Sequence, residues 1–270
     1  MVGRADVRAF YDDFLESRMV QYRLFGNRRI ELAARRIEPY IHDRHRVLDV
    51  GCGIGIVTER IAARARDGRV WGIDLSPRNV WYAAHTVRKS NVSFFAADVL
   101  SDAEQIRAQT GGAFDVITMV DVIEHIPEGD RPALFAGLRA LSAPNAMLVL
   151  TYPSPQYQRW LQANRPQELQ IIDNVVELPT LLDETGAAGY GLRHYSLEDV
   201  WKRNQYAHCV LQTDEAVVAP ARAEPSLGQE IGQRVQRATR NAFLVPWRRW
   251  RFVTRVLNEE RRESPRAVDP

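Results

Sequence analysis

The fold of this 270-residue chain is decided by the stretch Val47-Leu48-Asp49-Val50-Gly51-Cys52-Gly53-Ile54-Gly55. A short apolar run enters a turn with three glycines, and a helical segment follows. Glycines carry no Cβ atom, so the backbone can bend tightly and approach a ligand at van der Waals distance. A dinucleotide site would prefer G-x-G-x-x-G, with its last glycine where Ile56 stands. The turn therefore predicts a ligand on the backbone and disfavours a pyrophosphate.

Short β-branched runs alternate with helical segments around this turn. We expect strands at 46–50, 69–73, 92–97, 114–120, 146–152, 191–196 and 206–212, and helices near 54–66, 77–89, 102–110 and 130–142. Ser76 followed by Pro77 is a good cap and first turn for the second of these helices. Strand and helix in repeated alternation indicate a parallel sheet. The predicted fold class is α/β, with a doubly wound, mostly parallel seven-stranded sheet.

Acidic residues follow the second and third expected strands. Asp74 ends Val70-Trp71-Gly72-Ile73-Asp74, and Asp98 follows Phe94-Phe95-Ala96-Ala97. Each acid taken alone could be a helix cap or a solvated loop residue. Ligands bind at the carboxyl ends of the strands in open α/β sheets. Together with the glycine turn, the two acids therefore indicate a binding site at that edge.

Asp49 through Gly55, with these two acids, resembles the motifs of class I methyltransferases that use S-adenosylmethionine (SAM). The resemblance covers about residues 40–152. It implies a Rossmann-like methyltransferase core, SAM as cofactor and S-adenosylhomocysteine as product. It also implies that Gly51 and Gly53 pass under the methionine part of SAM, with Cys52 between them, while Asp49 orders the turn and helps to hold the amino end.

The same resemblance assigns roles further along the chain. Asp74 would accept hydrogen bonds from both ribose hydroxyls, and Leu75 would pack on adenine. Asp98 would take the adenine amino group, and the N–H of Val99 would reach the ring. Two more residues complete the expected cofactor site: Asp121, where the chain passes the methionine moiety, and Tyr11, which resembles a lid tyrosine that closes over SAM.

The expected fourth strand leads into Asp121, Glu124 and His125. In the similar ubiquinone-pathway O-methyltransferases, a Glu-His pair follows this strand. Methyl transfer from a sulfonium depends mainly on orientation, but a base would help a hydroxyl acceptor. His125 is therefore the candidate base. The alternative is a structural histidine that braces the loop.

These features favour a SAM-dependent methyltransferase with a small-molecule acceptor, and O-methylation is favoured because hydroxyl acceptors are common. One alternative is a macromolecule methyltransferase. The chain lacks the N/D-P-P-Y/F motif of enzymes that methylate nucleic-acid amino groups, because Tyr152-Pro153-Ser154-Pro155 does not match it, so we expect no nucleic-acid partner. The other alternative is a SAM-binding protein of the same fold with a structural or cyclase role.

The chain divides into three expected parts. Residues 1–40 form an N-terminal helical lid, residues 41–218 form the SAM-binding core, and residues 219–270 form a linker and a basic helical tail. Within the core, a polar insert at 153–188 is expected to cover the acceptor. An aromatic set could line the acceptor pocket, namely Tyr152, Tyr157, Trp160, Tyr195, Trp201, Tyr206 and His208.

Charge and composition set further limits. The net charge is +2, but Arg222 to Pro270 holds eleven arginines and six acids, so the tail is basic. Its segment 243–253 mixes apolar and cationic side chains, and we favour docking on the core or self-association over an acidic membrane surface. No apolar run approaches the roughly 20 residues that span a bilayer, so we expect a cytoplasmic protein without membrane insertion. Its two cysteines, Cys52 and Cys209, form no disulfide framework, and we expect no metal site.

Overall fold

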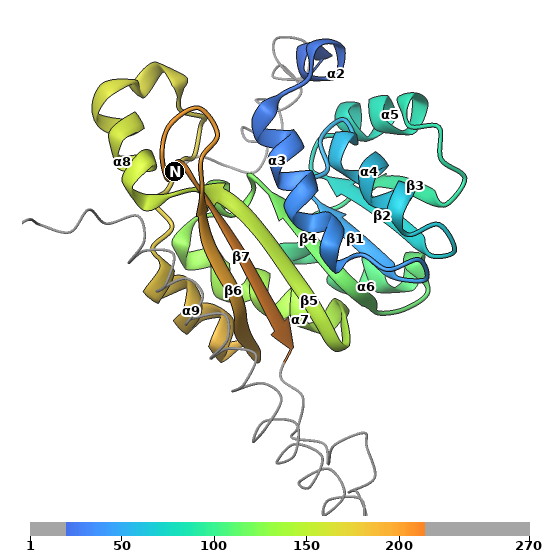
Figure 1. Ribbon diagram of the computed structural model, residues 1–270. Coiled ribbons are helices and arrows are strands. Elements are labelled where there is room, and N and C mark those ends of the chain that lie inside the picture. Colours follow the sequence, from blue (N-terminus) through green and yellow to red (C-terminus); the bar gives the residue numbers. More distant parts are fainter. Residues whose placement is uncertain (1–19, 214–270) are drawn as a thin grey trace, which may run out of the picture. The chain divides into compact units, whose positions relative to one another are not determined.

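The structure, a computed structural model, describes residues 20–213 (Figure 1). The predictions for Tyr11, the linker and the basic tail lie outside these residues. Within the described part, no helix is both long enough and apolar enough to cross a membrane.

Seven strands form one sheet in the order β3-β2-β1-β4-β5-β7-β6. Their bounds are β1 Arg46–Val50, β2 Arg69–Asp74, β3 Val92–Ala96, β4 Phe114–Val120, β5 Ser142–Pro153, β6 Tyr190–Glu198 and β7 Tyr206–Thr213. Only β7 runs against its neighbours, pairing antiparallel with both β5 and β6. The prediction of a doubly wound, mostly parallel seven-stranded sheet is confirmed.

The helices of the described part lie between or before the strands. Their bounds are α2 Val20–Phe25, α3 Arg28–Ile37, α4 Ile56–Arg64, α5 Pro77–Thr86, α6 Val99–Thr110, α7 Arg131–Leu141, α8 Pro155–Asn164 and α9 Leu178–Ala187. Short 3₁₀ turns lie at η2 Glu38–Tyr40, η3 Ile123–His125, η4 Glu128–Asp130 and η5 Pro166–Glu168. Figure 1 shows α3 and α4 on one face of the sheet and α6, α7 and α9 on the other.

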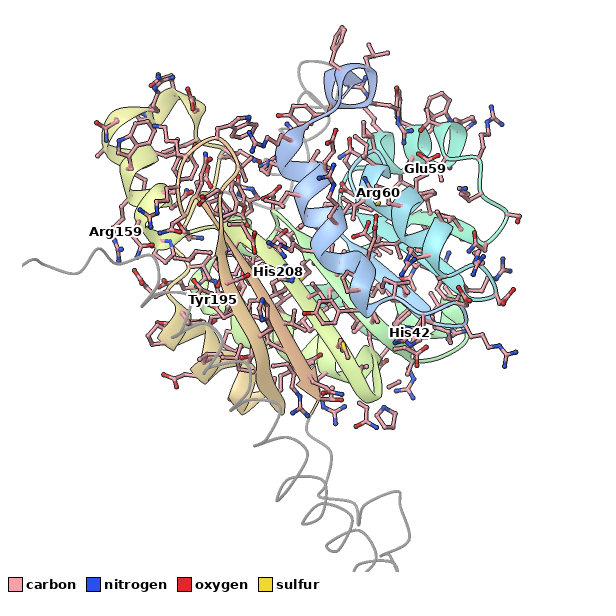
Figure 2. The ribbon with its side chains drawn as sticks, viewed as in Figure 1. His42, Glu59, Arg60, Arg159, Tyr195 and His208 are labelled. Atoms are coloured by element: carbon pink, nitrogen blue, oxygen red, sulfur yellow. The ribbon has the colours of Figure 1, made fainter. Side chains whose placement is uncertain are left out.

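Two apolar cores, one on each face, hold these layers together. Val47 of β1 packs with Ile37 of α3 and Ile61 of α4 in one core. Its neighbour Leu48 points to the opposite face and joins the core formed with α6, α7 and α9. Successive side chains in a strand alternate between faces, so a strand covered on both sides must be apolar at consecutive positions. Figure 2 shows charged side chains such as Glu59 and Arg60 on α4, where Arg60 pairs with Glu38.

The helix starts follow local capping chemistry. Ser76 caps α5, as predicted, because its Oγ accepts a hydrogen bond from the N–H of Asn79 at 3.1 Å. Asp98 caps α6 by accepting from the N–H of Leu100 at 2.9 Å, so this helix starts at Val99 rather than near Asp102. Asp102 has non-helical dihedrals (φ −113°, ψ 15°) and marks a kink within α6.

The segment 153–188 has two structurally different halves. Its second half forms α9, which contacts α7 and β6 and buries Leu181 and Thr185. A strand that runs parallel to an earlier one needs a crossover connection, and α9 supplies it between β5 and β6. The first half, with α8 and η5, follows the carboxyl end of β5. Only this half lies where an acceptor-covering insert was expected.

Replacing Leu48 by alanine tests the central place of β1. Its side chain is fully buried, so Leu48→Ala is expected to lower the free energy of unfolding by about 2 to 5 kcal/mol. The control is Leu192→Ala, since Leu192 on the edge strand β6 is 43% exposed. Its loss should be much smaller. Urea unfolding measures both losses, and equal losses would contradict the placement of β1 in the core.

Candidate functional site

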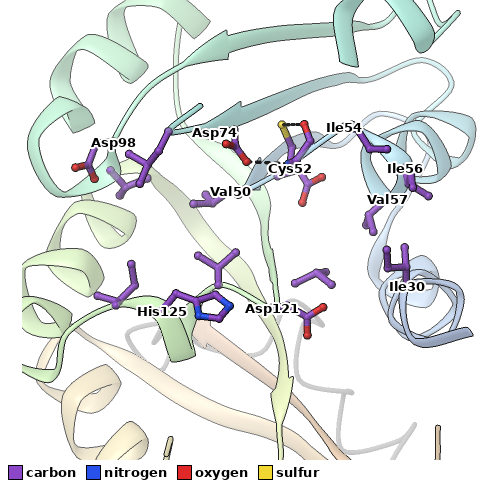
Figure 3. Close-up of a pocket in the computed structure, with 18 of the residues that line it drawn as sticks. Ile30, Val50, Cys52, Ile54, Ile56, Val57, Asp74, Asp98, Asp121 and His125 are labelled. Atoms are coloured by element: carbon purple, nitrogen blue, oxygen red, sulfur yellow. Dashed lines mark hydrogen bonds between the residues drawn. The ribbon is translucent and has the colours of Figure 1, made fainter. Parts of the chain in front are cut away.

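One pocket opens at the carboxyl ends of β1, β2 and β4, where sheets of this kind bind ligands (Figure 3). It brings together every residue predicted for the site apart from Tyr11: Asp49, Gly51, Cys52, Gly53, Asp74, Leu75, Asp98, Val99, Asp121 and His125. In Figure 3, Asp74 and Asp98 lie on one side of the pocket, and Asp121 and His125 lie on the other. Other lining residues were not predicted from the sequence, among them Tyr22, Arg29, Ile30 and Gln170.

The turn after β1 needs its glycines for two reasons. Gly51, Gly53 and Gly55 have φ values of 68°, 52° and 77°, which other residues rarely adopt. A Cβ atom on Gly51 would lie 2.3 Å from Cγ2 of Val122, so Gly51 lets the segment after β4 pass close to the turn. A Cβ atom on Gly55 would lie 2.9 Å from Cγ2 of Val87.

Asp49, at the end of β1, stabilises the turn by hydrogen bonds to two neighbouring elements. Its two carboxylate oxygens accept hydrogen bonds from Oγ1 of Thr58 in α4 at 2.6 Å and from Oγ1 of Thr118 in β4 at 2.7 Å. Burial raises the pKa of Asp49 to about 6, although both hydrogen bonds oppose this shift. The carboxyl group therefore joins the turn, the following helix and the neighbouring strand.

Asp74 holds the other side of the turn. Its Oδ2 accepts from the N–H of Gly53 at 2.9 Å. Its Oδ1 accepts from the N–H of Ser76 at 2.9 Å and from the side-chain amide of Asn79 at 3.1 Å. The resemblance implied only a ribose contact for Asp74, but this carboxylate also fixes the glycine turn to the end of β2.

Asp121 pairs with Arg29 across the pocket wall. Oδ2 of Asp121 lies 3.1 Å from Nη1 of Arg29, which also donates to the hydroxyl of Tyr206 at 3.1 Å. Asp121 has a left-handed backbone (φ 55°), which is strained for a residue other than glycine. Within residues 20–213, Oδ1 of Asp121 and Nε of Arg29 are buried without a hydrogen-bond partner. Two residues that line the pocket therefore have a buried acceptor and a buried donor without a hydrogen-bond partner in the described part of the chain.

His125 lies at the end of η3 and is almost fully buried. Its Nδ1 lies 2.6 Å from the carbonyl oxygen of Ile172, so Nδ1 carries the proton and donates. Burial lowers the pKa of His125, while the carboxylate of Asp173, 3.7 Å from Nδ1, opposes this shift. The ring is neutral at pH 7, and Nε2 is its basic nitrogen.

Glu124, beside His125, is buried and does not line the pocket. Its Oε1 lies 3.8 Å from Nε2 of His125. Burial raises the pKa of Glu124 well above its ordinary value, and the nearby charge of Asp121 adds to the shift. Burial and the charge of Asp121 therefore both favour the protonated form of the Glu124 carboxyl group.

Residues 170–174, which we call the brace segment, fix this turn. The backbone N–H of Asn174 donates to the carbonyl of Glu124 at 2.8 Å, and its side-chain amide donates to the carbonyl of Ile126 at 3.1 Å. Asp173 accepts from the N–H of Gln170 at 2.7 Å and from the amide of Gln158 at 2.9 Å. The brace segment thus fixes His125 and brings Gln170 to the pocket.

The aromatic set that could line an acceptor pocket lies outside this pocket, since none of its seven members lines it. Tyr152 is fully buried in the core, and Tyr206 touches the site only through Arg29. Within the described residues, His, Cys, Asp and Glu side chains form no group of three or more that could hold a metal ion.

A sheet of this topology, with a glycine turn after β1 and acids after β2 and β3, defines a class I SAM-dependent methyltransferase. The family model of the methyltransferase domain matches residues 21–195, more than half of the chain. The chain therefore belongs to the methyltransferase domain family. Its class makes it an enzyme with SAM as cofactor.

Curated relatives and solved structures agree with this assignment. The ubiquinone biosynthesis O-methyltransferase of Psychrobacter cryohalolentis is 37% identical over 106 residues, 39% of this chain and 40% of that protein. The enzyme of the same name from Xanthomonas axonopodis pv. citri is 32% identical over 123 residues, 46% of this chain and 48% of that protein. The chain thus spans under half the length of these relatives.

The fold itself matches solved methyltransferases. Magnesium protoporphyrin IX methyltransferase from Synechocystis, crystallised with S-adenosylhomocysteine, superposes with a TM-score of 0.60 at 16% identity, covering 78% of this chain and all of that chain. A SAM-dependent methyltransferase from Anabaena variabilis also gives a TM-score of 0.60, at 17% identity, covering 78% of this chain and 95% of that one. At such identities the likeness concerns the fold.

The raised pKa of Asp49 predicts a pH-dependent stability. The folded protein keeps a proton on Asp49 up to about pH 6, whereas the unfolded chain releases it near the ordinary pKa of 3.8. This contribution to the free energy of unfolding is fully present below the unfolded pKa, and it is lost as pH rises through about 6. Its size is at most about 3 kcal/mol.

Asp49→Asn removes the titrating group and should flatten the profile over this window. Urea unfolding of both proteins between about pH 4 and pH 7 measures the difference. Parallel profiles for the two proteins would show that Asp49 does not titrate in this range.

Proposed function

We propose that this domain transfers the methyl group of SAM to a hydroxyl group of a small-molecule acceptor. One observation supports this proposal above all: the predicted cofactor residues and His125 share one pocket, and His125 lies across it from Asp74 and Asp98. Bound SAM would supply an activated methyl group on a sulfonium, which leaves orientation as the protein's main task. The names of the curated relatives, O-methyltransferases, favour oxygen as the methylated atom.

The polar groups of the pocket support SAM as its ligand. We assign the methionine end to Arg29 and Asp121, because their unsatisfied Nε and Oδ1 atoms complement a carboxylate and an ammonium. Gly51 and Gly53 would lie under the methionine chain, with Cys52 between them. Asp49 would act on this end through the turn, which it stabilises by accepting hydrogen bonds from Thr58 and Thr118.

The nucleoside end would lie toward β2 and β3. We assign the ribose hydroxyls to Asp74, whose carboxylate is held in place by the backbone of the turn. Leu75 and Val99 line the pocket beside it and would contact adenine. Asp98 would accept from the adenine amino group while capping α6.

His125 would act as the base. Its Nδ1 donates to Ile172, so Nε2 has the lone pair that accepts the hydroxyl proton of the acceptor as the methyl group bonds to oxygen. Asp173 would be a positioning residue, because it acts on the acceptor only through His125 and Gln170. Gln170 has a buried Oε1 without a partner in the described part of the chain, and it would accept a hydrogen bond from the acceptor.

Substitution of Asp74 tests the cofactor site. Asp74→Asn removes a charged acceptor and is expected to weaken SAM binding by about 1 to 3 kcal/mol in calorimetry. Asn79→Ala is the control, since it removes a donor to Asp74 and leaves the carboxylate charge unchanged. If the two variants lose equal affinity, Asp74 acts by fixing the turn. Unchanged affinity in folded Asp74→Asn would exclude Asp74 from the site.

Substitution of His125 tests the base. His125→Gln is expected to lower turnover by about 100-fold with little change in SAM affinity. The unsubstituted enzyme should gain activity as pH rises through the lowered pKa of His125 and then reach a plateau. Asp173→Asn should shift this rise to lower pH, because the carboxylate that favours the protonated ring is gone. If turnover of His125→Gln falls by less than about threefold, His125 is not the base, and the protein contributes to methyl transfer only by orienting the reactants.

Methyl transfer itself is tested with SAM labelled in the methyl group and a panel of hydroxylated and amino small molecules. Label should pass to hydroxylated compounds, with one S-adenosylhomocysteine released for each methyl group. SAM binding without label transfer or product release would favour a structural or cyclase role. Transfer confined to protein or nucleic acid would overturn the small-molecule acceptor.

A further inference from the structure

A second concave surface lies at the same edge of the sheet, between α8 and the 199–205 connection from β6 to β7. We call it the aromatic groove. It is separate from the cofactor pocket and is lined by Tyr157, Trp160, Leu197, Lys202, Arg203 and Asn204. Figure 1 shows α8 and this connection side by side beyond the carboxyl end of β5.

Hydrogen bonds build the groove before any ligand binds. At the start of α8, Ser154 donates from Oγ to the carbonyl of Asn204 at 2.7 Å and from its N–H to the carbonyl of Gln205 at 2.9 Å. Gln205 is 1% exposed, and its Oε1 accepts from the N–H groups of Trp201 and Lys202 at 2.9 and 3.0 Å. The connection is therefore fixed against the helix, and a ligand would meet a preformed surface.

One side of the groove is an aromatic platform. The rings of Tyr157 and Trp160 are stacked, with 5.9 Å between centroids and 12° between planes. Nζ of Lys202 lies 3.3 Å from the centroid of Trp160, a cation–π contact. This contact fixes an ammonium charge beside a flat apolar surface.

The groove has positive charge on its lining residues. Its lining contains Lys202 and Arg203 and no acidic residue. Two carboxylates of the neighbouring segments pair with arginines outside the groove, Glu198 with Arg36 and Glu177 with Arg159, which Figure 2 labels. Asp199, in the connection itself, accepts from the N–H of Asn204 and does not line the groove. Across residues 20–213, neither Lys202 nor Arg203 has an ion-pair partner.

Direct contacts connect the groove to the cofactor pocket. The ring of Tyr157 lies 6.3 Å from that of Tyr206, whose hydroxyl accepts from Arg29 at 3.1 Å. Arg29 in turn pairs with Asp121, and both line the pocket. The sheet order places β7 two strands from β4, roughly 10 Å across the sheet. Tyr157, Tyr206 and Arg29 therefore form a continuous series of contacts from the groove to the pocket.

We propose that the aromatic groove binds an anionic group of the acceptor, so that the substrates are small molecules with an apolar or aromatic body and a carboxylate, sulfonate or phosphate remote from the methylated atom. The body would stack on Tyr157 and Trp160, and the anion would pair with Lys202 and Arg203. This proposal rests on the proposed function, because it takes the ligand of the groove to be the methyl acceptor. Binding of a ligand to the groove, and the preference for an anion, are measurable without methyl transfer.

The test uses the full chain, saturated with S-adenosylhomocysteine, and two probes that differ in charge. The anionic probe is 6-hydroxynaphthalene-2-sulfonate, and the neutral probe is 2,6-dihydroxynaphthalene. Lys202→Met should weaken sulfonate binding about tenfold in calorimetry and change diol binding less than threefold. Lys89→Met is the matched control, since Lys89 is the chain's other lysine, is exposed and lies away from the groove. It should leave both affinities unchanged.

Three results would overturn the groove. They are no sulfonate binding by the unsubstituted chain, equal effects of Lys202→Met and Lys89→Met, and unchanged binding of both probes by Trp160→Leu. Lys202 is exposed, and urea unfolding checks that its variant stays folded. Methyl transfer is measured in parallel. Lys202-dependent sulfonate binding without methyl transfer to any acceptor would sustain the groove and refute the proposed function.

Discussion

The hydrogen bond from the N–H of Gly53 to Asp74 is the interaction on which the site depends. A glycine turn with three positive φ angles has many accessible conformations, and ordering it costs conformational entropy. Asp74 limits that freedom from β2, and Asp49 fixes the adjoining helix and strand through Thr58 and Thr118. The position of the turn, and hence of any ligand on it, follows from these two buried carboxyl groups.

The buried acids of this site differ in their pKa values and in their charge partners. Asp49 is held near a pKa of about 6, and Glu124 well above its ordinary value, whereas Asp121 has the guanidinium of Arg29 beside it. An uncompensated carboxylate is costly in a low-dielectric interior, so each of these groups is hydrogen-bonded, paired or protonated. Among the buried side-chain atoms that lack a hydrogen-bond partner in the described residues, Oδ1 of Asp121, Nε of Arg29 and Oε1 of Gln170 belong to residues that line the pocket.

The sequence predicted those parts of the protein that short-range chemistry determines. The strand, the turn and the helix around Asp49 to Gly55 follow from nine consecutive residues, and the cap at Ser76 follows from two. Arg29 could not be predicted, because one arginine among many in an N-terminal helix carries no signal for a partner as distant as Asp121. The brace segment was missed for the same reason, since its hydrogen bonds to Glu124 and Ile126 depend on tertiary packing. The insert as a whole was expected at this edge, but its half in α9 belongs to the helical layer.

The region that the family model matches includes the cofactor pocket and leaves out the cationic residues of the groove. The matched region, residues 21–195, contains the glycine turn, the acids after β2 and β3, and His125. It ends within β6, before Lys202 and Arg203, which line the groove from the β6–β7 connection. Donor chemistry is the same for any methyl acceptor, so its residues fit a shared family pattern. Recognition of a particular acceptor differs between enzymes, and the proposed groove takes its two cationic residues, Lys202 and Arg203, from a connection outside the matched region.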